Sequence, residues 1–105
     1  MNMRGGMNEI LRQAARLQRK VELAKEGLKD QEVIGESLGG KVKATVSLGG
    51  QVKNIDFDMA MVEQEGADLV KDAICAAINA GLETASKTME AEVEKVTGGV
   101  KIPGM

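Results

Sequence analysis

An apolar stripe in the first third of the chain is the sequence feature that most restricts its fold. Over residues 7–28, apolar residues recur at alternating intervals of three and four, the pattern of one face of an α-helix that packs against another helix. We therefore predict a helix over about residues 7–29 with an apolar face that needs a partner. The stripe consists of Met7, Ile10, Ala14, Leu17, Val21, Ala24 and Leu28.

Four basic residues lie away from this stripe, on the opposite side of the predicted helix. We call Arg12, Arg16, Arg19 and Lys20 the basic strip. Acidic residues flank the strip at Glu9 and Glu22, and none lies within it. A group of charges on a helix is most often an ordinary solvated surface. A rigid row of cations beside a dimerisation stripe also suits the binding of a polyanion, and a dimer would double the row.

Three strands are predicted after this helix, over residues 32–37, 41–48 and 51–58. In the second, Val42, Ala44, Val46 and Leu48 alternate with polar residues, which predicts one buried and one solvated face. The pairs Gly39-Gly40 and Gly49-Gly50 lie where tight hairpin turns require a positive φ. Because Val52 is out of register with Ile55 and Phe57, we expect a β-bulge between them.

A second long helix is predicted over residues 67–96, after a connecting stretch at 59–65 and before a tail at 97–105. Its larger apolar residues form a helical stripe, and small residues in its first half allow close approach to a sheet. The stripe consists of Ile74, Ile78, Leu82, Ala85, Met89, Val93 and Val96. The sequence therefore predicts one α+β domain, in the order helix, three-stranded antiparallel meander, helix. Helices of this length exceed strands of about 20 Å, so an identical partner is the simplest cover for the projecting parts.

The composition of the 105-residue chain argues against several classes of function. It has no His, and its single Cys75 lies among Ala and Ile at a predicted core position, where a thiol is most often a small apolar group. No apolar run is long enough to span a membrane, and no secretory signal is evident. We expect a cytoplasmic protein with no metal, no cofactor, no small-molecule substrate and no enzymatic activity.

Two weaker patterns have simple structural explanations. Residues 35–41 fit the spacing GxxxxGK of a phosphate-binding loop, but Val42 has no hydroxyl and an alternating strand follows in place of a helix. Asp56 and Asp58 could act as an acid–base pair or hold a cation, but solvent-facing residues of a half-buried strand are the more ordinary interpretation.

The charge is distributed unevenly along the chain. The net charge is −2 in total, but it is +3 over residues 1–30, −1 over 31–60 and −4 over 61–105. An anion would therefore approach the first helix and be repelled by much of the last one. This favours weak, local binding of a polyanion over tight wrapping.

From Glu32 onward three motifs follow one another: EVIGESLGGKVKATVSLGG (32–50), DLVKDAICAAIN (68–79) and VTGGVKIPGM (96–105). In this order and spacing they resemble the YbaB/EbfC family of nucleoid-associated DNA-binding proteins. An echo at 12–18 of the family's QxxxMQ-type helix extends the resemblance over nearly the whole chain. The chain departs from the family pattern at 57–61, where a Pro is missing, and at 79–81, where Asn-Ala-Gly replaces Asn-Asp-Ala.

The resemblance implies a tweezer-like homodimer in the nucleoid whose protruding helices bind double-stranded DNA with little sequence preference. The basic strip is the first candidate for the contact with phosphates. Further candidates, each more often ordinary surface charge, are Arg4, Lys87, Lys95 and Lys101. The alternative is an adaptor module that clasps a protein partner with its helices, because the acidic second half suits a basic protein better than DNA.

Overall fold

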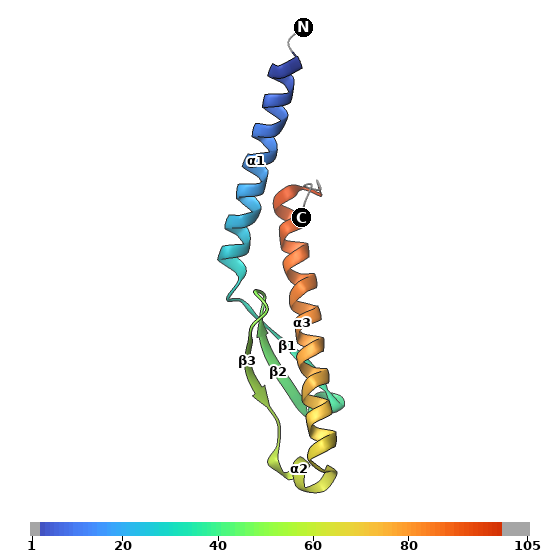
Figure 1. Ribbon diagram of the computed structural model, residues 1–105. Coiled ribbons are helices and arrows are strands. Elements are labelled where there is room, and N and C mark those ends of the chain that lie inside the picture. The colour runs from blue at the N-terminus through green and yellow to red at the C-terminus, as the bar shows by residue number, and fades with distance from the viewer. Residues whose placement is uncertain (1–2, 100–105) are drawn as a thin grey trace.

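The computed structural model describes the backbone of residues 3–99 and the side chains of residues 6–99 (Figure 1). It confirms the α+β architecture of two long helices around a three-stranded antiparallel sheet. The elements are α1 (Met3–Leu28), β1 (Glu32–Ser37), the 3₁₀ turn η1 (Leu38–Gly40), β2 (Val42–Ser47), β3 (Val52–Asp56), α2 (Met59–Glu65) and α3 (Ala67–Thr97).

The sheet has the order β1-β2-β3, and α3 packs against β1 and β2. Val42, Ala44 and Val46 of β2 are fully buried, whereas Lys43 between them is exposed. The predicted apolar face is therefore confirmed, but Ser47, predicted on the solvated face, is itself buried, where its Oγ accepts a hydrogen bond of 3.0 Å from the N–H of Gln51. Strand β2 lies in the middle of the sheet, and its apolar face forms the base of the core.

The β-bulge predicted in the third strand is present. Thr45 pairs with Asn54 and Val46 pairs with Val52, so Lys53 is an extra residue in β3. The extra residue shifts the alternation, which is why Val52 is out of phase with Ile55. In the turns, φ is positive at Gly39, Gly40 and Gly50, but not at Gly49.

Small residues of α3 face the sheet more closely than its large ones. Among its buried residues, Ala73, Ala77, Gly81 and Ala85 recur at every fourth position, one helix face. Most of the larger stripe residues flank this face and are half-buried. The backbone of α3 can therefore lie against the strands, with the larger apolar side chains closing the sides.

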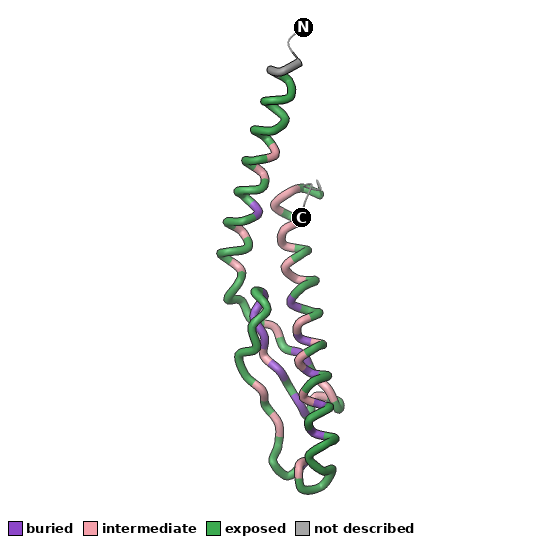
Figure 2. The backbone as a smooth tube through the Cα atoms, viewed as in Figure 1, coloured by how far each residue is buried: buried purple, intermediate pink, exposed green. Residues whose placement is uncertain are grey.

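The second half of helix α1 contacts α3, and its first half extends beyond the C-terminal end of α3 (Figure 1). Val21 is fully buried, whereas Met7, Ile10 and Leu11 are 58%, 63% and 59% exposed. Figure 2 shows that α1 is exposed along most of its length, while buried positions gather on the sheet and α3. The molecule is a rod of 76 × 19 × 16 Å, and one end is a single helix with an uncovered apolar face.

The boundaries differ from the sequence prediction chiefly at the start of the first helix, in the second and third strands and at residues 59–65. Helix α1 begins at Met3 and includes Gly5 and Gly6. Glycine lowers the stability of a helix, but it still supplies the amide N–H that the helix needs. The second and third strands are shorter than predicted. Residues 59–65, predicted as a connection, form α2, whose first turn is capped by Asp58 accepting a hydrogen bond from the N–H of Ala60 at 2.9 Å.

The predicted core position of Cys75 is wrong. Its side chain is exposed, because Ala73 and Ala77 on either side of it occupy the face that meets the sheet. A residue two positions from each buried neighbour is rotated well away from that face. The thiol therefore does not belong to the core.

Candidate nucleic-acid interface

The basic strip lies on a regular part of α1 that is open to solvent. Residues 12, 16, 19 and 20 are all exposed and belong to one uninterrupted helix. With a rise of about 1.5 Å per residue, the strip is about 12 Å long. The helix fixes the spacing of these cations, so they form a rigid row whose position does not depend on a loop.

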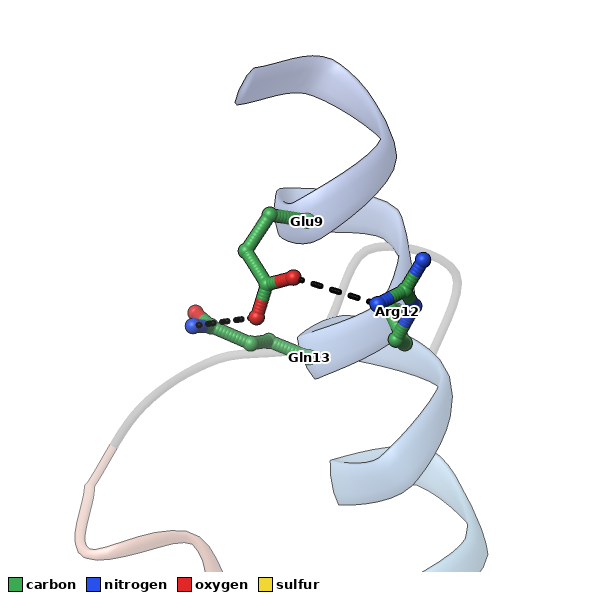
Figure 3. Close-up of polar contacts among 3 residues, drawn as sticks. All are labelled: Glu9, Arg12 and Gln13. Atoms are coloured by element: carbon green, nitrogen blue, oxygen red, sulfur yellow. Dashed lines mark hydrogen bonds and ion pairs between the residues drawn. The ribbon is translucent and has the colours of Figure 1, made fainter. Parts of the chain in front are cut away.

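The first member of the strip has an acidic neighbour (Figure 3). Nη1 of Arg12 lies 3.5 Å from Oε2 of Glu9, one helical turn earlier, and both side chains are more than half exposed. The other carboxylate oxygen of Glu9 accepts a hydrogen bond of 3.4 Å from Nε2 of Gln13. Both contacts are long and open to water, so they hold Arg12 only weakly.

The other three members of the strip lack such a neighbour. Among residues whose side chains the structure describes, no carboxylate lies within 4.0 Å of the charged nitrogens of Arg16, Arg19 or Lys20. Their donors are therefore available to an external anion. These three residues form the part of the strip best placed to contact phosphate.

The more distant candidates differ from these three. Lys87 and Lys95 are exposed on α3, but each forms an ion pair of 3.0 Å within its helix, with Glu83 and Glu92. Arg4 lies in the first turn of α1, with its side chain outside the described part, and Lys101 lies outside the described residues altogether. Among these candidates with described side chains, Arg16, Arg19 and Lys20 are thus the ones without an ion pair.

The contact between Glu9 and Arg12 was missed from the sequence. The sequence pattern places Glu9 only beside the strip, although positions three apart on a helix are neighbours on its surface. This spacing was the available signal. The strip therefore consists of three cations without a carboxylate partner among the described side chains and one cation that is partly neutralised.

Other chemical possibilities find little support in the described structure. Asp58 serves as the N-cap of α2, and residues 35–41 are followed by strand β2 in place of the helix that a phosphate-binding loop requires. Among residues 3–99, no group of three or more His, Cys, Asp or Glu side chains is arranged to hold a metal ion. In the same range, neither of the long helices combines the length and hydropathy needed to cross a bilayer.

Comparison with known proteins identifies the chain. The profile of the YbaB/EbfC DNA-binding family matches residues 3–100, nearly the whole chain. The protein belongs to this family. The resemblance inferred from the sequence is thus confirmed, and the surface described above belongs to a YbaB/EbfC protein.

The fold also matches a solved structure. The crystal structure of an uncharacterized protein from Helicobacter pylori is similar to this chain with a TM-score of 0.63 and 16% identity. The match covers 87% of this YbaB/EbfC chain and 91% of the other. At this identity the similarity concerns the fold alone, and it shows that the arrangement of helices and sheet is shared.

Proposed function

We propose that this YbaB/EbfC protein is a nucleoid-associated protein of the cytoplasm that binds duplex DNA as a homodimer. The phosphate backbone is the main target, and sequence preference is small. The observation that carries the proposal is the row formed by Arg16, Arg19 and Lys20, which are exposed and lack a described carboxylate partner, in a chain of a DNA-binding family. The chain has no Trp or Tyr and only one Phe, so it lacks the aromatic residues on which single-stranded bases stack.

The homodimer is supported by the uncovered apolar face of α1. Met7 and Ile10 continue the stripe that α3 covers further along the helix, but no described part of the chain covers them. A small core without large aromatic residues also gains from association. A second copy would bring a second basic strip to the same DNA.

We expect the affinity for DNA to be determined by charge–charge attraction to phosphates. Binding that neutralises a few phosphates without reading bases has a dissociation constant of about 10⁻⁴ to 10⁻⁶ M at physiological salt. It weakens as salt rises, with a slope of log K against log salt of about −0.9 for each phosphate neutralised. No catalytic step and no bound cofactor are part of this function.

The experiment is a titration of a duplex of mixed sequence at four salt concentrations. We expect Arg16→Ala/Arg19→Ala/Lys20→Ala to reduce the magnitude of the slope by about 2.7 per engaged protomer, because three phosphate contacts are lost. The matched control, Lys41→Ala/Lys53→Ala/Lys71→Ala, removes the same charge from exposed positions outside α1. Equal loss of binding in the two triple variants would remove the strip from the mechanism.

The alternative function is a module that binds another protein, and the same titration distinguishes it from DNA binding. The net charge of −4 over residues 61–105 is the feature that favours it. If the unmodified protein fails to bind duplex DNA even at low salt, the DNA-binding proposal fails and the protein-partner function takes its place.

A further inference from the structure

We infer that Glu9 is a positioning residue that weakly restrains Arg12 and reduces its contribution to DNA binding relative to the three basic residues that follow. This inference rests on the proposed function and refines it. Its starting point is the arrangement in Figure 3, where one carboxylate lies between a guanidinium and an amide of the same helix.

The position of Glu9 on α1 also matters for phosphate binding, in addition to its contact with Arg12. Glu9 lies seven residues before Arg16, two helical turns along the same side of α1, so it lies at the end of the basic strip and not on a separate face. A phosphate that approaches Arg12 therefore meets a carboxylate already present at that site. The carboxylate repels the phosphate and competes for the guanidinium.

The size of the effect follows from the geometry. The ion pair is 3.5 Å long, and the side chains of Arg12 and Glu9 are 62% and 51% exposed. Exposed pairs of this kind contribute about 0.2–1 kcal/mol, which corresponds to a factor of about 1.4 to 5 in an equilibrium constant. The restraint on Arg12 is therefore graded: it weakens one phosphate contact without preventing binding.

Two substitutions on α1 test the inference. Glu9→Gln removes the charge and keeps the shape, and Glu22→Gln is the control, because Glu22 is exposed on the same helix and lacks a described ion pair. We expect Glu9→Gln to raise affinity for a mixed-sequence duplex by a factor of about 1.4 to 5 and to steepen the salt slope by up to about 0.9 per protomer. Glu22→Gln should raise affinity less and leave the slope unchanged.

A double-mutant cycle with Arg12→Ala supplies a readout that a general change in charge would not affect. In the unmodified protein, Arg12→Ala should weaken DNA binding less than Arg16→Ala does. In the Glu9→Gln background, Arg12→Ala should weaken binding about as much as Arg16→Ala. Circular dichroism of each variant checks that α1 retains its helix content.

The possible results separate this inference from the proposed function. If all variants bind DNA but Glu9→Gln and Glu22→Gln behave alike, or the cycle shows no coupling, the role of Glu9 is overturned and DNA binding by the strip stands. If the unmodified protein does not bind duplex DNA even at low salt, both are overturned. Coupling between positions 9 and 12 with a steeper slope supports both.

Discussion

Gly35 of β1 and Gly81 of α3 meet backbone to backbone. A Cβ atom added to Gly35 would overlap the main-chain N of Gly81 and the carbonyl oxygen of Ala77 and would lie 2.6 Å from the Cα of Gly81. A Cβ atom on Gly81 would in turn lie 3.2 Å from the N of Gly35 and 3.1 Å from a methyl group of Val46. This contact sets how closely α3 approaches the sheet, and it holds the rigid base from which α1 projects.

Substitution at this contact should destabilise the fold strongly. We expect Gly35→Ala to lower the free energy of unfolding by at least about 2 kcal/mol, because the new methyl group meets main-chain atoms that cannot rotate away. Urea denaturation followed by circular dichroism measures the change. Gly27→Ala is the matched control: nothing lies within 4 Å of its added Cβ, and Ala favours a helix over Gly by about 1 kcal/mol, so this variant should be stabilised. Equal effects at the two positions would contradict the close packing.

A half-buried hydroxyl also connects β1 to α3. Oγ of Ser37 donates a hydrogen bond of 2.6 Å to the carbonyl oxygen of Ala73, in a partly buried position. Ser37→Ala should cost about 1 kcal/mol of unfolding free energy, because a polar interaction between two elements is lost. Ser86→Ala, an exposed site on α3, should change stability by less than about 0.5 kcal/mol in the same denaturation experiment. If both serines respond alike, the hydrogen bond contributes nothing measurable.

The apolar face at the start of α1 should control association. We expect Met7→Gln/Ile10→Gln to weaken the proposed homodimer by at least about tenfold in sedimentation equilibrium, because the two side chains lose roughly 1.5–3 kcal/mol each of apolar burial. Gln forms helices about as well as Met and better than Ile, so α1 should remain helical. Leu23→Gln is the control: Leu23 is 67% exposed but lies away from the apolar stripe. A dimer weakened only by Leu23→Gln would place the interface on the other side of the helix.

The ion pair near the end of α1 predicts a specific pH dependence. Nζ of Lys29 lies 2.6 Å from Oε1 of Glu26, and this hydrogen bond and its charge raise the pKa of Lys29 above its ordinary value of 10.5. A raised pKa in the folded state means that the stabilisation is fully present below the pKa of the unfolded chain and is lost as pH rises through the folded value. The effect should therefore appear only in strongly alkaline solution.

Nuclear magnetic resonance titration of the Lys29 side chain measures this shift directly. We expect Glu26→Gln to return the pKa of Lys29 toward its ordinary value, while Glu22→Gln leaves it unchanged. Because both side chains are exposed, the accompanying change in stability should be small. A pKa of Lys29 that is the same with and without Glu26 would show that the pair is not populated in solution.

The sequence by itself determined the type and order of the two long helices and the three strands, although it did not predict the short helix α2. Periods of three and four produced the two long helices, and a period of two in Val42, Ala44 and Val46 identified the central strand, because these periods follow from backbone geometry alone. The break in phase at Val52 identified the bulge for the same reason. The family pattern placed the chain among DNA-binding proteins, and the charges of the basic strip were visible as spacing on one helix.

The tertiary structure decided which face of each helix is covered and by what. The exposure of Cys75 and the need for Gly at 81 depend on how α3 is rotated against the sheet, and many rotations share the same apolar period. Because α3 ends before it reaches them, Met7 and Ile10 are uncovered. The predicted lengths of the helices and strands suggested that part of a helix projects, but they did not show which residues it contains. The contact of Glu9 with Arg12 depends on side-chain rotamers, which spacing permits but does not select. Local periodicity is encoded along the chain, whereas packing depends on residues that are distant in sequence and meet only when the chain has folded.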